Sequence, residues 1–218
     1  MSSRPMMQLC FRGQLAFLGL ASSAMHDLRR RTALIGAGFL AGMVGAPFMS
    51  ATPAGGEPPA DETPDLVLLR RTFVLANEAK QSGNTPFGAL VADAEGNVIV
   101  ERGNQSAPPD GDPTRHAEVV TAAAAWHVLG TAGMNQATLY TSAEPCVMCA
   151  GAAYWTGIGR IVYGLPEHRL LEFTGDNPEN PTFALPCREV LAHGQRAITV
   201  VGPLLEDEAA QPHEGYWH

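Results

Sequence analysis

The sequence predicts an α/β fold in which helices cover both faces of one sheet. Two observations support this fold class: a hairpin pattern comes early in the domain, and helical and strand-like segments then alternate along the chain. The chain has 218 residues, of which 45% are hydrophobic and 17% are charged. This is enough material for one well-packed domain and too little for two large ones.

The first elements of the domain are an amphipathic helix and a hairpin. Apolar residues recur at helical spacing over 65–80, with charged residues on the other side. Two strand-like runs follow, 88–93 and 97–102, and turn residues at 95–97 join them. The Ala-rich segment 114–129 is predicted to be a helix, with Asp112 as its N-cap and Pro113 at its first position.

The second half of the domain alternates between strands and helices. The run ATLYTS predicts a strand over 137–142, and a helix is expected from Pro145 to about Trp155. Further strands are predicted over 161–165 and 198–203. Residues 166–194 are interpreted as a loop with one or two helices, and the last strand leads into an acidic helical tail.

The N-terminal part of the chain is typical of an export signal. Three arginines, Arg29, Arg30 and Arg31, precede a Gly-rich apolar run, and small residues follow it, which indicates a twin-arginine signal peptide. The apolar run 33–49 is short and contains four glycines and a proline, so a stable membrane anchor is not expected. The predicted organisation is an N-terminal extension with the signal over 1–54, a linker over 55–64 and the domain over 65–218. We expect a periplasmic protein, or a cytoplasmic one if this segment is not a functional signal.

Charge and cysteine content exclude some classes of protein. From residue 55 onward, nine Lys and Arg stand against 21 Asp and Glu. So acidic a surface repels phosphate backbones, and a nucleic-acid partner is not expected. Four cysteines in a chain of this size do not form a disulfide scaffold. Cys187, which has no partner at metal-binding spacing, is interpreted as a buried apolar cysteine.

Two predicted helix starts carry the residue types of a metal site. His116 and Glu118 lie in TRHAE, and Cys146 and Cys149 lie in EPCVMC. Cysteines at positions i and i+3 share one face of a first helical turn, where backbone N–H groups stabilise thiolates. One His and two Cys suit Zn²⁺ and leave a fourth position for water, as in catalytic sites. Glu118 is not needed as a ligand and is free to move protons, and HxE followed by PCxxC is the signature of zinc deaminases.

Two other interpretations of the cysteine pair remain open. A CxxC pair alone is more often redox-active or structural, which makes a periplasmic thiol redox protein an alternative. That alternative leaves the HAE sequence and Asn104 without a role. A non-catalytic zinc protein is a weaker alternative, because the ligand set leaves an open position beside a carboxylate.

The sequence resembles the cytidine deaminase-like superfamily, within it the branch of guanine deaminases and tRNA adenosine deaminases. The matching segments are TPFGALVAD, ERGN, DPTRHAEVV, TLYTSAEPCVMCAGAAYW and IGRIVYG, within about residues 65–165. The resemblance implies a three-layer α/β/α sandwich with a mixed five-stranded sheet. It also implies zinc bound by His116, Cys146 and Cys149, with Glu118 as the proton shuttle, and a homodimer.

The resemblance further implies residues that bind the substrate. They are Asn104, the backbone around Ala117, Phe87 and Trp155. Relatives also use an acidic residue after the fourth strand, for which Glu167 and Asp176 are both candidates here. The tail could supply Tyr216 or Trp217 as a lid, or it could be exposed. The hypothesis is a zinc-dependent deaminase of a free nucleobase or nucleoside, with a guanine-type purine favoured and a tRNA adenosine deaminase as the alternative.

Overall fold

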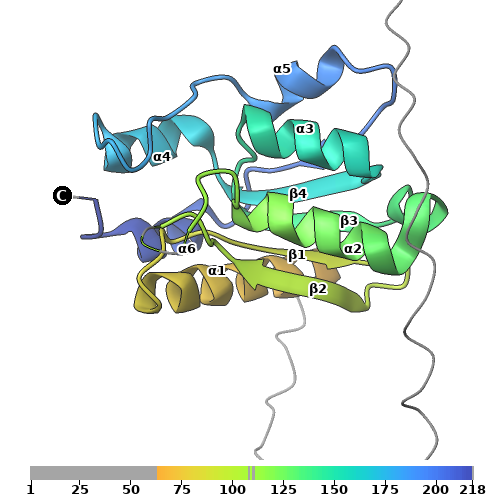
Figure 1. Cartoon of the computed structure of the whole chain (residues 1–218), viewed down its shortest axis with the longest axis horizontal. Helices are drawn as coiled ribbons and strands as arrows, with labels where there is room; N and C mark the ends of the chain where they lie inside the picture. Colours follow the sequence, from red (N-terminus) through yellow and green to blue (C-terminus); the bar gives the residue numbers. More distant parts are fainter. Residues whose placement is uncertain (1–62, 108, 110, 218) are drawn as a thin grey trace, which may run out of the picture. The chain divides into compact units, whose positions relative to one another are not determined.

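A five-stranded sheet with the strand order β2-β1-β3-β4-β5 forms the centre of the fold (Figure 1). The computed structural model describes residues 63–107, 109 and 111–217. The strands are β1 (Gly88–Ala92), β2 (Val98–Gly103), β3 (Thr138–Ala143), β4 (Arg160–Leu165) and β5 (Thr199–Val201). Strand β1 runs antiparallel to β2 and β3, whereas β3, β4 and β5 run parallel. The mixed sheet implied by the resemblance is thus confirmed.

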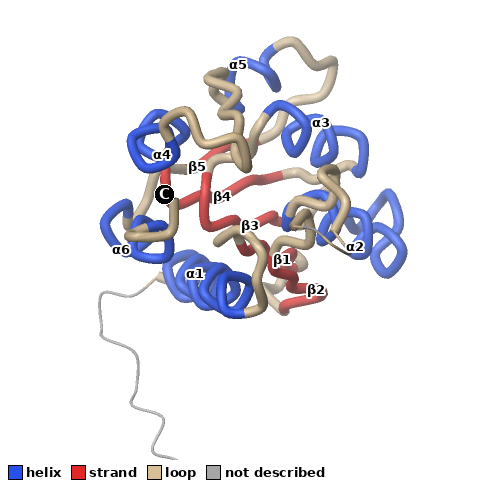
Figure 2. The backbone as a smooth tube through the Cα atoms, turned by 60° about the vertical axis from the view of Figure 1, so that its left-hand side comes forward, coloured by secondary structure: helices blue, strands red, loops and turns tan. Residues whose placement is uncertain are grey.

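Helices pack against both faces of this sheet. The helices are α1 (Pro64–Gln81), α2 (Ala117–Met134), α3 (Val147–Thr156), α4 (Glu167–Thr174), α5 (Cys187–Ala192), α6 (Glu206–Ala210) and a 3₁₀ turn (Gln211–His213). Figure 2 shows α2 and α3 on one side of the strands and α1 and α6 on the other. The three-layer α/β/α architecture is therefore confirmed.

Alternation along the strands explains the two layers of core. Ala89 and Val91 of β1 lie in the buried cluster that also holds residues of α2, α3 and α5. Leu90 and Ala92 lie in the second cluster, with residues of α1, α4 and α6. Successive strand residues point to opposite faces, so an all-apolar run such as GALVA supplies both cores at once.

The start of α2 differs from the sequence prediction. His116, not Asp112, is the N-cap, and the helix begins at Ala117. The Asp112 carboxylate instead accepts hydrogen bonds from the backbone N–H and the hydroxyl of Thr114, at 2.8 and 2.7 Å. Asp favours such local turns as strongly as it favours N-caps, so it ends the preceding loop without starting the helix. This shift puts His116 at the very end of the helix.

The predicted signal segment, residues 1–54, and Cys10 lie outside the described residues. Helix α1 begins at Pro64, the last residue assigned to the linker. Within the described part of the chain, no helix has both the length and the apolar character needed to cross a bilayer. Cys187 is fully buried in the core cluster between β4, α3 and α5, as predicted.

Candidate metal centre and active site

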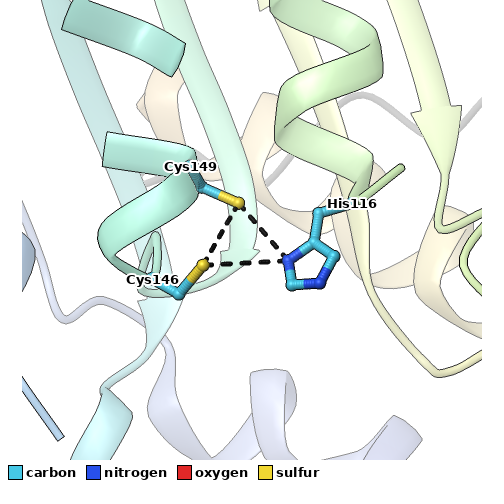
Figure 3. Close-up of side chains that lie close together, drawn as sticks. All are labelled: His116, Cys146 and Cys149. Carbon is cyan, nitrogen blue, oxygen red and sulfur yellow. Dashed lines mark hydrogen bonds between the residues drawn. The ribbon is translucent and has the colours of Figure 1, made fainter. Parts of the chain in front are cut away.

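The three predicted metal ligands meet where the N-termini of α2 and α3 lie side by side. His116 is the N-cap of α2, Cys146 is the N-cap of α3, and Cys149 lies in the first turn of α3. Figure 3 shows their side chains pointing toward one another from the two helix starts. Because α2 and α3 pack against each other, residues about 30 positions apart in sequence become neighbours.

The spacing of the ligand atoms fits Zn²⁺. The two Sγ atoms lie 3.5 Å apart, and His116 Nδ1 lies 3.8 Å from Cys146 Sγ and 3.5 Å from Cys149 Sγ. A tetrahedral zinc with Zn–S bonds of about 2.3 Å and Zn–N bonds of about 2.0 Å separates its ligand atoms by roughly 3.5–3.8 Å. Within the described residues, these three form the only group with the donors and geometry of a metal site. They bind Zn²⁺ through one nitrogen and two sulfurs and leave the fourth tetrahedral position open for water.

Electrostatics at the two helix starts favour this metal. The hydrogen bond with Cys149 lowers the pKa of Cys146 to about 4, helped by His116. The same contact, together with burial, raises the pKa of Cys149. The pair therefore keeps one shared proton, which a bound metal displaces because zinc ligates thiolates.

Glu118 lies beside the ligands with the properties of a proton carrier. It is 5% exposed, and the Thr141 hydroxyl donates a hydrogen bond to Glu118 Oε1 at 3.2 Å. Burial raises the pKa of Glu118, while the nearby His116 opposes that rise. A carboxyl group with a raised pKa holds a proton more readily than an ordinary one, which suits Glu118 to accept a proton and pass it on.

A cavity of about 690 Å³ opens beside this centre and includes His116, Glu118 and Cys146 in its walls. It lies beyond the carboxyl ends of β3 and β4, where α/β sheets commonly bind ligands. Its other walls come from the loops around Thr85 and Ser106, from α4, from residues 178–183 and from the tail. The volume is in the range of small-molecule sites.

The structure brings two of the four predicted substrate residues to this cavity. Phe87 lines it directly. Asn104 is 4% exposed and lies behind Thr85 and Ser106, to whose hydroxyls its Nδ2 donates. Its Oδ1 has no hydrogen-bond partner among the described residues. A buried amide oxygen without a partner is costly, so this group is suited to a ligand donor that reaches the cavity floor.

The other two predicted substrate residues lie elsewhere. The Ala117 side chain is fully buried in the core cluster under α2, although its neighbours His116 and Glu118 line the cavity. Trp155 is 84% exposed, and its ring meets only the edge of Tyr154 among described aromatic rings. Trp155 does not line this cavity, and its role in substrate binding stays a prediction. Trp155 lies on the solvent-exposed face of α3.

Three cavity residues were not assigned from the sequence alone. Glu167 lines the cavity and Asp176 does not, which favours Glu167 of the two acidic candidates. Burial raises the pKa of Glu167 to about 7. Tyr216 of the tail also lines the cavity, so the tail is not simply exposed. Glu144, which stands in the EPC sequence beside the ligands, was missed; its nearness to Cys146 was the signal available.

Comparison with known proteins agrees with this site. Residues 63–165 match the family described as the cytidine and deoxycytidylate deaminase zinc-binding region. A protein named "probable cytosine deaminase" from Schizosaccharomyces pombe is 40% identical over 153 residues, which cover 70% of this chain and 92% of that protein. A guanine deaminase from Bacillus subtilis is 41% identical over 102 residues, 46% of this chain and 64% of that protein.

Solved structures give the same result. A guanine deaminase from Nitrosomonas europaea superposes with a TM-score of 0.58 and 27% identity, over 74% of this chain and 93% of that one. A structure of a mutant protein in complex with 8-azaguanine has a TM-score of 0.59 and 28% identity, over 71% of this chain and 85% of that one. The thiol redox alternative finds no support among these relatives. The geometry of the three metal ligands, the fold and the similarity over 70% of the chain together show that this chain belongs to the cytidine deaminase-like superfamily of nucleoside deaminases.

Proposed function

We propose that this chain catalyses the zinc-dependent hydrolytic deamination of a free nucleobase or nucleoside, with a guanine-type purine as the favoured substrate. One observation carries the proposal: the cavity beside the zinc ligands is lined by four glutamates, of which Glu144 is bonded to main-chain N–H groups, and by no described Lys or Arg. Carboxylates pair with the N–H groups of a base, while a phosphate needs cationic or N–H donors. The site is thus suited to an unphosphorylated base.

The residues of the site divide the chemistry between them. His116, Cys146 and Cys149 would hold Zn²⁺, which would supply an activated water at neutral pH. Glu118 would take a proton from the attacking water and deliver it to the ring nitrogen next to the amine-bearing carbon, to which the hydroxyl adds. Glu118 would then move the remaining proton of the added hydroxyl to the amine, and the C–N bond would break to release ammonia and leave a carbonyl. The apolar ring of Phe87 and the buried Asn104 hold the base in the cavity.

Two features support a purine. Relatives that match the chain include guanine deaminases, and one solved relative binds 8-azaguanine. The carboxylate of Glu167 faces the cavity, where it can accept from adjacent N–H groups such as those on one edge of guanine. A cavity of about 690 Å³ has room for a two-ring base.

Cytosine is a second candidate, and a specific observation favours it. The similarity to the probable cytosine deaminase extends over 153 residues, more than residues 63–165 contain. It therefore extends beyond the matched family region, whereas the similarity to the guanine deaminase spans 102 residues.

The test is an ammonia-release screen with zinc-loaded protein. Guanine, cytosine, adenine, their nucleosides and an RNA with a tRNA anticodon stem are each offered at equal concentration. Turnover of guanine above all others is expected. Turnover of cytosine alone would replace the purine by the second candidate, and conversion of adenosine in the RNA without any free base would overturn the proposal in favour of a tRNA adenosine deaminase.

A further inference from the structure

Glu144 joins the metal centre to a remote wall of the cavity. Its side chain is buried, with the residue 7% exposed. One carboxylate oxygen accepts the backbone N–H of Glu167 at 3.1 Å, and the other accepts the backbone N–H of Cys187 at 3.0 Å. The Glu144 backbone N–H donates to the carbonyl of Leu165 at 2.8 Å, which fixes the residue at the end of β4. Both oxygens are thus committed to main-chain donors far along the chain.

Both N–H groups that Glu144 accepts belong to the first residue of a helix. Glu167 is the first residue of α4 and Cys187 is the first residue of α5. Each follows a proline N-cap, Pro166 and Pro186, neither of which makes a side-chain cap hydrogen bond. The first N–H groups of a helix have no partner within it and need an acceptor from elsewhere. Glu144 supplies that acceptor to both helices.

The segment between these two donors builds one wall of the cavity. It contributes Glu167, Leu170 and residues 178–183 to the lining. Within the wall, the hydroxyl of Thr182 forms a hydrogen bond with that of Thr174 at 3.1 Å and accepts one from the side-chain amide of Asn180 at 3.1 Å. These bonds connect α4 to residues 180–182. Glu144 holds the first and last residue of this segment, and it stands two positions before the zinc ligand Cys146.

We propose that Glu144 is a positioning residue that sets the distance between this wall and the zinc centre. This inference rests on the proposed function, since it assigns the residue to substrate binding in the same site. Glu144 acts through the backbone of residues 167 and 187, and so on the placement of Glu167 and of residues 178–183. It therefore controls the affinity for the base, and it leaves the metal and the proton transfer by Glu118 in place.

The test is the variant Glu144→Gln. Its amide keeps one acceptor oxygen, but its NH₂ group faces the second N–H donor, so one helix start loses its partner. We expect KM to rise about tenfold while kcat changes less than about threefold, since one buried donor is left unpaired away from the reacting atoms. Zinc content should stay at the wild-type value. Amide hydrogen exchange at Glu167 or Cys187 should accelerate about tenfold, because the loss of one acceptor frees that N–H.

Glu172→Gln is the matched control, because Glu172 is an exposed residue of α4 and the same charge is removed. It should leave KM, kcat and amide exchange as in the wild type. A raised KM with unchanged exchange at both amides would mean that Glu144 touches the substrate directly, and loss of zinc would mean that it supports the metal ligands. Either outcome overturns the inference.

The conservative variant Glu144→Asp keeps the carboxylate on a shorter side chain. Its KM and its exchange rates are expected to lie between those of the wild type and Glu144→Gln. If the glutamine variant does not fold, the same measurements are made on Glu144→Asp. Exchange and zinc content do not depend on turnover. If no base or nucleoside is deaminated, the proposed function fails, whereas the role of Glu144 in holding the two helix starts is still decided by the exchange data.

Discussion

At the scale of single residues, a variant of Glu118 tests metal binding and turnover separately. Replacing it by Gln keeps the size and hydrogen-bonding capacity of the side chain but removes the exchangeable carboxyl proton. We expect Glu118→Gln to retain one zinc per chain and to lose about 10²–10⁴-fold in kcat, the range for a general acid–base group. Zinc analysis and ammonia release measure the two effects. Ammonia release within tenfold of wild type would remove Glu118 from the proton transfer.

His213 is expected to contribute to the dependence of stability on acid pH. It is 1% exposed, and its Nδ1 accepts the indole N–H of Trp217 at 3.1 Å. Burial, with the charge of Lys80, lowers the pKa of His213 to about 3. The unfolded chain takes up this proton below about pH 6.5, whereas the folded chain stays neutral, so stability falls as the pH drops from about 6.5 toward 3.

The measurement is the free energy of unfolding against pH. His213 should contribute a loss of up to about 1.4 kcal/mol per pH unit in that window. The variant His213→Gln should show a correspondingly smaller slope, and His127→Gln, at an exposed position, should keep the wild-type slope. Identical slopes for the wild type and His213→Gln would contradict the assignment. Acid also removes the metal, but this affects the wild type and both variants equally. The difference between their slopes therefore reports on His213 alone.

At the scale of elements, the end of α1 holds the tail over the cavity. The Lys80 ammonium donates to the carbonyls of Pro212 and Glu214 at 2.9 and 3.3 Å and lies 5.6 Å above the Tyr216 ring. Tyr216 in turn lines the cavity, and its hydroxyl donates to the carbonyl of Asn84 at 3.4 Å. Lys80 therefore attaches residues 212–216 of the tail to the end of α1.

We expect Lys80→Met to raise KM several-fold and to make the tail a site of early proteolysis, because both carbonyls lose their donor. Lys80→Arg keeps the charge and the donors and should stay close to wild type. Limited proteolysis followed by mass measurement of the fragments, together with KM, provides the check. A tail as resistant as in the wild type would show that packing of Trp217 on His213 is sufficient to hold it.

Local patterns explain which parts of this arrangement could be predicted. His116, Cys146 and Cys149 were found because each stands at a fixed offset from a helix start, and the strands were found because apolar runs are local. The exposure of Trp155 was not predicted, because the sequence does not say which face of α3 turns outward. The partners of Glu144 lie 23 and 43 residues away, so their meeting depends on the packing of α4 and α5 at the sheet edge.

At the scale of the whole molecule, charge restricts the substrate. From residue 55 on, nine Lys and Arg stand against 21 Asp and Glu, and the described cavity lining has carboxylates without Lys or Arg. A neutral base approaches such a surface freely, whereas a phosphorylated nucleoside meets a negative field that salt screens. The 5′-monophosphate of the preferred nucleoside should therefore have a kcat/KM lower by about a hundredfold or more than the base, about 3 kcal/mol in binding the transition state.

Ionic strength distinguishes this field from a simple steric barrier. A tenfold rise in salt should change kcat/KM for the free base by less than about twofold, since no net charge is steered. The same rise should increase kcat/KM for the monophosphate, because screening weakens the repulsion that opposes its entry. If the monophosphate is rejected equally at both salt concentrations, the cavity excludes it by size. If it reacts as well as the base, a cation outside the described lining must bind the phosphate, and the assignment to unphosphorylated substrates is wrong.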